Sequence, residues 1–333
     1  MAEGTPTLRE CVVYARRRLP RYEAELLVST SLDVPHNHLY AFDERAVAPA
    51  AFARMAQTVA RRQDGEPVAY ILGTRGFWNL DLEVTPDVLI PRPDTETLVA
   101  AALPLIAPGA RVVDVGTGCG AVALAIASER PEASVTATDV DPACIALCRR
   151  NAERLGLSVA TRVADCFGFG GLFDVIVSNP PYVDDDDPRL DEGDLRFEPR
   201  RALRGGPNGG LDIIARLVRE APAHLVPGGW LCLEHGFDQE RALARAFRAH
   251  GFRRVRCHRD IENRPRVTVG CWERLKSRPI QRGFEGLADN QLTHFPYKPC
   301  ANACPTRPQA LNRGSMVQVG HPRAIRLSAR QHP

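Results

Sequence analysis

The stretch Ser178-Asn179-Pro180-Pro181-Tyr182-Val183 has the residue types that could hold a small, planar polar group. It follows the apolar run FDVIV, and its two prolines end a strand because each lacks an N–H and fixes φ near about −65°. The Asn179 side-chain oxygen and the Pro180 carbonyl can accept the N–H bonds of an amide or amine, and the Tyr182 ring can pack flat against such a group. The stretch therefore predicts a rigid cradle that orients a nitrogen for reaction.

A glycine-rich turn, DVGTGCG at residues 114–120, joins the apolar run RVVDV to the helical stretch AVALAIA. Glycines let the backbone turn sharply and come close to a ligand, and the helix behind them offers free N–H groups. The next predicted strand, SVTATD, ends at Asp139, where a carboxylate is placed to accept both hydroxyls of a ribose. Together the two features predict an adenosine-bearing cofactor. Asp141, which precedes a proline, is instead predicted to cap a helix.

Two classes of cofactor fit that arrangement, nicotinamide dinucleotides and S-adenosylmethionine. The turn has the spacing G-x-G-x-G, whereas the dinucleotide fingerprint is G-x-G-x-x-G. Residue 121 is alanine, which the fingerprint tolerates only one residue later. The spacing therefore favours S-adenosylmethionine. The proline-containing stretch favours it further, because it follows the fourth predicted strand, where an open α/β sheet presents its ligand crevice.

Short apolar runs alternate with helical patterns from residue 111 onward, which predicts a parallel sheet with helices on both faces. These runs are RVVDV, SVTATD, SVATRVA, FDVIVS and WLCLEH. The last two strand candidates, FRRVRCHR and PRVTVGCW, are separated by residues 260–264 alone, too few for a crossover helix, so we expect them to pair antiparallel. The predicted fold class is α/β, with a doubly wound, mostly parallel, seven-stranded sheet and a reversed final hairpin, preceded by a small helical N-terminal domain.

The parts of the chain outside this alternation have other patterns. Apolar residues recur at helical spacing through residues 7–62, and RGFWNLDLEV at 75–84 suits a short hairpin. The C-terminal 58 residues contain seven prolines and no sustained period, so we expect them to be disordered or loosely attached. Four parts are predicted: a helical domain at 1–72, a hairpin linker at 73–91, an S-adenosylmethionine-dependent domain at 92–275 and a basic, Pro-rich tail at 276–333.

Charge and composition limit the class of protein. The 333-residue chain has a net charge of +3, but residues 276–333 hold nine Lys or Arg and two Asp or Glu, which leaves −4 for residues 1–275. That balance argues against an enzyme that grips duplex nucleic acid, which needs a basic face. The central apolar run at 98–107 is half the length of about 20 residues that spans a bilayer, and no secretory signal is visible, so we expect a cytoplasmic protein without membrane contact. No cysteines have zinc-site spacing, and no metal is expected.

Several longer stretches give a more specific indication. In order along residues 75–270 they are GFWNLDLEV, TPDVLIPRPDTETLV, VVDVGTGCGAVALAIA, VSNPPYV, GDLRFEPRRAL, GGWLCLEHG and RVTVG. With them the sequence resembles the S-adenosylmethionine-dependent amino-methyltransferases, and it is most similar to the release-factor glutamine methyltransferases of the PrmC/HemK family. The resemblance implies methyl transfer from S-adenosylmethionine to the side-chain amide nitrogen of the glutamine in the Gly-Gly-Gln motif of class I peptide chain release factors. It also implies that the helical domain recognises the substrate.

The resemblance implies roles for single residues as well. Asn179, Pro180, Pro181 and Tyr182 would bind the substrate glutamine, with Asn179, Pro180 and Tyr182 acting in catalysis. Phe77, in the predicted hairpin, is a further candidate for the wall of the substrate pocket. The cofactor would be bound by Asn179 and by Gly116, Thr117, Gly118, Cys119, Gly120, Asp139, Asp165 and Cys166, of which Asp139 would contact the ribose and the last two the adenine. Many relatives have a large aromatic or apolar residue in place of Cys166, which implies weaker adenine stacking here.

Three other functions remain as alternatives. An adenine or cytosine amino-methyltransferase would share both the glycine turn and the proline motif, and a flipped base would fit the same cradle. The charge of residues 1–275 and the lack of a basic target-recognition segment stand against it. A nicotinamide-dependent dehydrogenase is disfavoured by the G-x-G-x-G spacing and the Asn-Pro-Pro-Tyr motif. A noncatalytic cofactor-binding protein would be excluded by measured methyl transfer.

Overall fold

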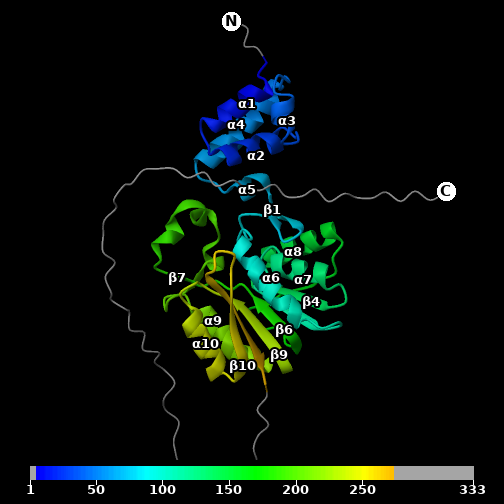
Figure 1. Ribbon diagram of the computed structural model, residues 1–333, viewed down its shortest axis with the longest axis vertical. Helices are drawn as coiled ribbons and strands as arrows, with labels where there is room; N and C mark the ends of the chain where they lie inside the picture. The colour runs from blue at the N-terminus through cyan, green and yellow to red at the C-terminus, as the bar shows by residue number, and fades with distance from the viewer. Residues whose placement is uncertain (1–4, 274–333) are drawn as a thin grey trace, which may run out of the picture. The chain divides into compact units, whose positions relative to one another are not determined.

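The computed structural model describes residues 5–273, which belong to one compact unit (Figure 1). The predicted tail at 276–333 lies outside the described residues. In residues 5–273 we find no helix whose length and apolar content would let it cross a bilayer.

The N-terminal region is helical, as its apolar spacing predicts. Its helices are α1 Leu8–Arg16, α2 Arg21–Ser31, α3 His38–Ala41, α4 Pro49–Gln63 and α5 Val68–Leu72. Helix α1 begins at a capping box, in which the Thr7 hydroxyl accepts the Glu10 N–H and the Glu10 carboxylate accepts the Thr7 N–H at 2.8 Å. The apolar faces of these helices pack on one another through side chains that include Val12, Val28 and Met55, so this region has a small core of its own.

A β-hairpin follows, and its prediction at residues 75–84 is confirmed. Strands β1 Thr74–Phe77 and β2 Leu80–Glu83 pair antiparallel. The buried side chain of Asn151 fixes the hairpin to the rest of the chain, because it exchanges hydrogen bonds with the Glu83 backbone at 2.8 and 3.0 Å and donates to the Cys119 carbonyl at 3.0 Å. The hairpin is thereby tied to the glycine turn.

A seven-stranded sheet forms the centre of residues 92–273, as predicted. Its strands are β3 Arg111–Val115, β4 Ser134–Asp139, β5 Ala160–Val163, β6 Phe173–Ser178, β9 Leu225–Glu234, β10 Phe252–Arg259 and β11 Pro265–Trp272. The spatial order is β10-β11-β9-β6-β3-β4-β5. Strands β9 to β5 in that order run parallel, while β11 is antiparallel to both β9 and β10. The predicted reversed hairpin is therefore confirmed.

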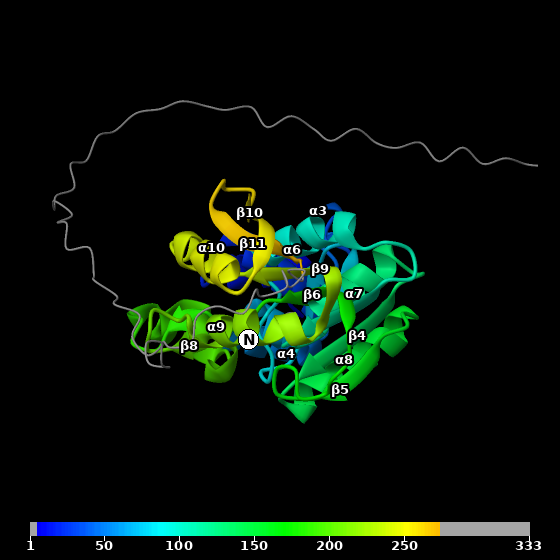
Figure 2. The same cartoon turned by 90° about the horizontal axis from the view of Figure 1, so that it is seen from below.

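Helices cover both faces of this sheet (Figure 2). They are α6 Glu96–Ala102, α7 Ala121–Glu129, α8 Pro142–Leu155, α9 Asp212–Glu220 and α10 Glu240–Ala249. Helices α6, α7 and α8 pack on one face and α9 and α10 on the other, so adjacent residues of β3, Val112 and Val113, are fully buried in opposite cores. Burial on both faces explains why the central strands are continuous apolar runs.

Short elements complete the chain. They are the 3-10 turns η1 Pro93–Thr95, η2 Leu103–Leu105, η3 Pro188–Asp191, η4 Gly193–Phe197, η5 Arg200–Ala202 and η6 Ala221–Ala223, and the paired strands β7 Val183–Asp184 and β8 Arg204–Gly206. They lie mostly around the carboxyl ends of the parallel strands.

The order of the strands places two sequence motifs together. From β3 the chain moves outward through β4 to β5, and it then returns to form β6 on the opposite side of β3. The sheet therefore changes winding direction between β3 and β6, and such a switch point leaves a crevice at the carboxyl ends of the two strands. The glycine turn follows β3 and the Asn-Pro-Pro-Tyr motif follows β6, so both lie at this crevice.

Candidate active site

A cavity of about 230 Å³ occupies this crevice. Residues from the glycine turn, from the ends of β4 and β6 and from the loop before α6 line it. Of the residues predicted for the site, the lining contains Gly116, Thr117, Gly118, Cys119, Asp139, Asp165, Cys166, Asn179, Pro180 and Pro181. Gly120, Tyr182 and Phe77 are not part of the lining.

The glycine turn presents backbone to the cavity. Gly116 and Gly118 have φ angles of 75° and 56°, and a Cβ at either residue would meet no atom within 4 Å. Space for a ligand therefore lies directly against the peptide groups. Gly120 has a different role, because a Cβ there would lie 2.7 Å from the Cys148 sulfur and 2.9 Å from a Leu124 methyl group. It allows α7 to pack closely against α8.

Asp139 lies at the end of β4 with its carboxylate at the rim of the cavity. One carboxylate oxygen accepts the Gly118 N–H at 2.9 Å and the other accepts the Asp141 N–H at 3.0 Å. Each oxygen keeps a further acceptor site, so the carboxylate can still accept two hydroxyl groups. Asp141 caps α8 by accepting the Ala143 N–H at 2.8 Å, as the sequence predicts.

The proline motif is anchored at its first residues. The Ser178 hydroxyl donates to the Val115 carbonyl at 2.6 Å, which joins the end of β6 to the end of β3. The Asn179 side-chain N–H donates to the Thr95 hydroxyl at 3.1 Å. Because the amino end of the Asn179 amide faces Thr95, its oxygen is the end available to an N–H group in the cavity. The arrangement suits an acceptor site for an amide or amine nitrogen.

The chain is similar to known families and proteins over most of its length. The family model of the PrmC N-terminal domain matches residues 9–73, and that of the methyltransferase small domain matches residues 94–193. The release factor glutamine methyltransferase of Pseudomonas aeruginosa is 48% identical over 271 residues, which cover 79% of this chain and 98% of that protein. The Escherichia coli protein of the same name is 42% identical, over 75% of this chain and 92% of its own.

The chain belongs to the release factor glutamine methyltransferase family. Its two matched segments correspond to the helical region and to the part of the sheet that carries both motifs.

Asp114 is a residue of this methyltransferase to which the sequence analysis assigned no role. It is 1% exposed, lines the cavity, and accepts the Thr117 hydroxyl at 2.6 Å and the Ala123 N–H at 3.2 Å. Burial raises the pKa of this carboxyl to about 7, although the Thr117 hydroxyl and the Ala123 N–H lower it. Asp114 ties the glycine turn to the start of α7. Its place at the head of the DVGTGCG stretch was the available signal.

Asp165 and Cys166, which follow β5 in the chain, also line the cavity. Asp165 is exposed and pairs with Arg216 of α9 at 2.8 Å. Cys166 has a φ of 47°, a left-handed conformation that is uncommon for a residue with a side chain. Burial raises the pKa of the Cys166 thiol to about 11, so the thiol is neutral at physiological pH and offers a small apolar surface to the cavity.

Backbone packing supports the motif from behind. A Cβ at Gly205 would lie 2.7 Å from the Pro181 carbonyl oxygen, and one at Gly210 would overlap the carbonyl of Tyr182. The Gln239 side-chain N–H₂ donates to the carbonyls of Tyr182 at 2.9 Å and Gly209 at 2.7 Å. The GGPNGG loop is thus held directly against the motif. The sequence analysis missed this support, and the glycine cluster was its signal.

Two loops close another side of the cavity. Glu198, only 3% exposed, pairs with Arg92 and accepts the Ile90 N–H at 3.1 Å. Arg201, which lines the cavity, pairs with Asp141 and donates to the Asp87 carbonyl at 3.0 Å. These contacts join the loop before α6 to the segment that contains η5.

Phe77 does not line the cavity either. It is 2% exposed and belongs to the same apolar core as α6, α7 and α8. An aromatic residue in a hairpin suits a core and a pocket wall equally well in sequence. Within residues 5–273, no group of three His, Cys, Asp or Glu residues is arranged to hold a metal ion.

Proposed function

We propose that this chain transfers a methyl group from S-adenosylmethionine to the side-chain amide nitrogen of the glutamine in the Gly-Gly-Gln motif of class I peptide chain release factors. The observation that carries the proposal is the meeting of the open glycine turn and the Asn179 amide at one cavity, in a chain of this family.

The residues around the cavity fit the cofactor. The exposed peptide groups at Gly116 and Gly118 would contact its methionine and ribose portions, and Asp139 would accept the ribose hydroxyls with the acceptor sites that its two backbone contacts leave. Asp165 and Cys166 would lie beside the adenine. S-adenosylmethionine supplies a methyl group that its positive charge already activates. The protein's own task is therefore to place the acceptor nitrogen.

Asn179 and Pro180 would perform that placement. A glutamine amide nitrogen is a poor nucleophile because its lone pair is delocalised into the carbonyl group, so it must be held in line with the methyl group. The Asn179 side-chain oxygen and the Pro180 carbonyl would each accept one N–H of this amide. Both acceptors also favour the positive charge that develops on the nitrogen. Pro181 keeps the loop rigid, and the Tyr182 ring would pack on the flat amide.

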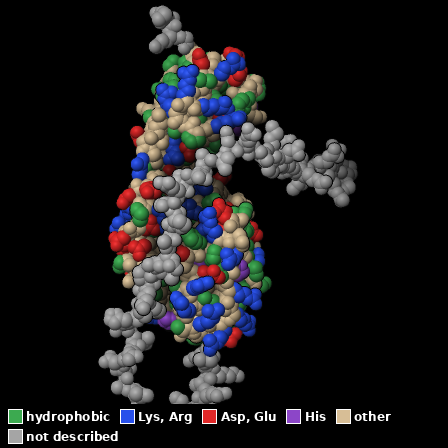
Figure 3. All heavy atoms as spheres, turned by 60° about the vertical axis from the view of Figure 1, so that its left-hand side comes forward, with side chains coloured by type: hydrophobic (Ala, Val, Ile, Leu, Met, Phe, Trp, Pro, Cys, Tyr) green, Lys and Arg blue, Asp and Glu red, His purple; other side chains and the backbone are tan. Residues whose placement is uncertain are grey.

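The alternative acceptor, a base of a nucleic acid, has less support. The cavity lining contains the acidic residues Asp87, Asp114, Asp139 and Asp165, and Arg201 is its one basic residue. Basic side chains lie on the upper and lower parts of the face in Figure 3, and exposed arginines occur on α10 and β10, neither of which lines the cavity. The negatively charged phosphate backbone of a nucleic acid would be repelled by a cavity with this acidic lining.

Methyl transfer from labelled S-adenosylmethionine tests the proposal. The protein is incubated with purified class I release factors, with duplex DNA and with ribosomal RNA, and the label is located by mass spectrometry. We expect one methyl group on the Gly-Gly-Gln glutamine and none on a release factor in which that glutamine is replaced by asparagine. Label on nucleic acid and not on release factor would overturn the proposal in favour of the base methyltransferase.

A further inference from the structure

Glu234, the last residue of β9, lies behind the motif and has no place in the reaction described so far. It is 1% exposed, and its oxygen Oε1 accepts the Tyr182 hydroxyl at 3.0 Å. Among residues 5–273 its other oxygen, Oε2, is buried without a hydrogen-bond partner. A buried, incompletely paired carboxylate destabilises a fold, so its presence here calls for a function.

Thr95 lies between Glu234 and Asn179, the first residue of the Asn-Pro-Pro-Tyr motif. Its hydroxyl accepts the Asn179 side-chain N–H at 3.1 Å, and its proximity lowers the pKa of Glu234. Thr95 is itself only 4% exposed. The side chains of Asn179 and Tyr182 are therefore held at one buried polar cluster, Asn179 by Thr95 and Tyr182 by Glu234.

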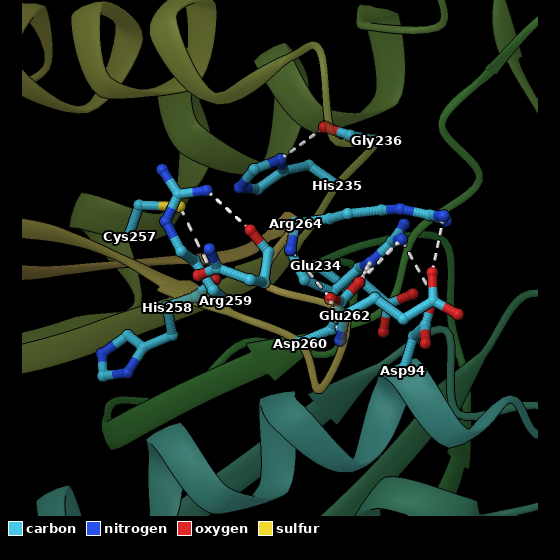
Figure 4. A network of polar contacts seen from close by, with 12 residues as sticks. Asp94, Glu234, His235, Gly236, Cys257, His258, Arg259, Asp260, Glu262 and Arg264 are labelled. Carbon is cyan, nitrogen blue, oxygen red and sulfur yellow. Dashed lines mark hydrogen bonds and ion pairs between the residues drawn. The ribbon is translucent and has the colours of Figure 1, made fainter. Parts of the chain in front are cut away.

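Arg266 of β11 forms ion pairs that hold this cluster in place. It is 7% exposed and pairs with Asp94 at 2.9 Å and with Asp260 at 3.1 Å. Asp94 precedes Thr95 in η1, so the first pair immobilises the turn from which Thr95 projects. Figure 4 shows Asp94, Glu234 and Asp260 converging from three separate elements. The cluster is rigid because η1, β9 and the β10–β11 hairpin all contribute to it.

We propose that Glu234 is a positioning residue for methyl transfer, which acts by holding the Tyr182 hydroxyl and thereby the ring that covers the acceptor amide. This inference rests on the proposed function. A phenol ring that is free at its hydroxyl end can rotate and tilt, whereas one anchored at 3.0 Å to a buried carboxylate keeps a single orientation. Thr95 performs the matching task for Asn179.

The charge of Glu234 gives the proposal a second measurable consequence, which is a dependence of turnover on pH. Burial raises the pKa of this carboxyl to about 7, and the nearby Asp94 raises it further. The Thr95 and Tyr182 hydroxyls and the Arg266 guanidinium lower this pKa, but burial outweighs them. His235, the next residue, contacts Thr268 at 2.9 Å, and burial lowers its pKa, so it is neutral near pH 7. Ionised Glu234 accepts the Tyr182 hydroxyl more strongly than the protonated form does. The anchoring should therefore strengthen as pH rises through about 7.

A double-mutant cycle on release-factor methylation tests the inference. We expect Glu234→Ala and Tyr182→Phe each to lower kcat by about tenfold, because each removes the same hydrogen bond. The double variant should be no slower than the slower single variant. Cofactor affinity, measured by calorimetry, should stay within about twofold of the wild type, since Glu234 does not line the cavity. Glu262→Ala, on the exposed hairpin turn, is the matched control and should be fully active.

The conservative variant separates positioning from a structural role. Glu234→Gln keeps an acceptor oxygen without a charge, so it should retain more activity than Glu234→Ala. The ratio of wild-type to Glu234→Gln kcat should increase with pH through about 7, and this ratio cancels the titration of groups common to both proteins. If Glu234→Ala fails to fold, Glu234→Gln with and without Tyr182→Phe provides a cycle for the charge-dependent part of the hydrogen bond: the effect of Glu234→Gln on kcat should disappear in the Tyr182→Phe background.

Several results would overturn the inference. Losses that multiply in the double variant would show that Glu234 does not act through the Tyr182 hydroxyl. If Glu234→Gln has the wild-type kcat at every pH, or if its kcat is lower by the same factor at every pH, then the charge of Glu234 does not strengthen the anchoring of Tyr182 and the inference is wrong. If the wild-type protein itself methylates no release factor, it is the proposed function that has failed.

Discussion

Glu25 in the N-terminal helices and Glu234 at the end of β9 are both almost fully buried, yet their surroundings shift their pKa values in opposite directions. Burial raises the pKa of Glu25, but hydrogen bonds to Tyr40, Arg16 and Arg21 outweigh it and hold that pKa at about 2. Its carboxylate pairs with Arg16, with Arg21 at 2.8 Å and with His36 at 3.2 Å. Burial dominates at Glu234, where the pKa is raised to about 7.

The difference separates a structural region from a reactive one. In the helices a buried charge is surrounded by partners, so it joins α1, α2 and the segment before α3. At the carboxyl edge of the sheet, Asp114 and Glu234 both have raised pKa values, and one oxygen of Glu234 has no hydrogen-bond partner among residues 5–273. Perturbed groups of this kind are typical of functional sites. Substitutions at the sheet edge should therefore affect turnover or ligand binding first, and substitutions at Glu25 should affect stability first.

Asn179→Ala should give the largest effect and leave stability unchanged. It removes an acceptor that orients the substrate amide and that strengthens as charge develops, so we expect a loss of about 10² to 10³ in rate. Cofactor binding should persist, because the glycine turn and Asp139 hold the cofactor independently. Single-turnover assays with calorimetry of cofactor binding check both points. Near-normal turnover would mean that the cradle is assigned to the wrong residue.

Asn179→Asp sharpens that result. It keeps an acceptor oxygen and removes the N–H₂ that donates to Thr95 at 3.1 Å. We expect more activity than in Asn179→Ala, although less than in the wild type, because the new carboxylate loses its fixed orientation. An aspartate variant slower than the alanine variant would show that a charge at this point harms the site more than the lost acceptor does.

Asp139→Ala should lower cofactor affinity by about 1.5 to 3 kcal/mol, since two charge-assisted contacts to the ribose would be lost. The variant also frees the Gly118 N–H, which Asp139 accepts at 2.9 Å, so the glycine turn should become more mobile. Calorimetry measures the affinity, with Glu153→Ala on the exposed face of α8 as the control. Unchanged affinity would remove Asp139 from the cofactor site.

The sequence predicted the sheet, and the glycine turn and Asn179 do line one cavity, but the sequence did not indicate the residues that support the motif. Alternating apolar runs fix the order of strands and helices, and residues 260–264 are too short for anything other than the hairpin that joins β10 and β11. The glycine turn and Asn179 carry their chemistry in their own residue types. Thr95, by contrast, lies 84 positions from Asn179 in the chain, and a lone threonine has no pattern that reveals its partner.

The remaining misses have similar causes. Glu234 lies 52 positions from Tyr182, and only the spatial order of β9 beside β6 brings the two together. Phe77 was predicted at a pocket wall and lies in the core, because periodicity in a four-residue strand cannot distinguish the two. Local sequence therefore indicates the residues that carry reactive atoms, whereas their buried supports depend on the tertiary fold.

Glu25→Ala should lower stability by about 1 to 3 kcal/mol, because Arg16, Arg21 and His36 would lose their common partner. The partly exposed positions of Arg16 and Arg21 keep the loss below that of a fully buried ion pair. Thermal unfolding measures the change, and Glu44→Ala, at an exposed acid that pairs with Arg9, is the control. The folded variant should retain its cofactor affinity. Weakened cofactor binding would contradict the division between the two regions.

The most direct test of the comparison is the pH dependence of stability. Glu234 has a folded pKa of about 7, above its ordinary value of 4.5, so between these values the folded state binds more protons and stability falls as pH rises. Glu25 has a folded pKa of about 2, so its contribution is complete above pH 4.5 and is lost as pH falls toward 2. Each slope is at most about 1.4 kcal/mol per pH unit. Urea unfolding of Glu234→Gln should therefore show a shallower decline than the wild type from pH 5 to 7, and that of Glu25→Gln a shallower decline below pH 4.5. Parallel profiles for the wild type and either variant would mean that the corresponding carboxyl group has an ordinary pKa in the folded protein.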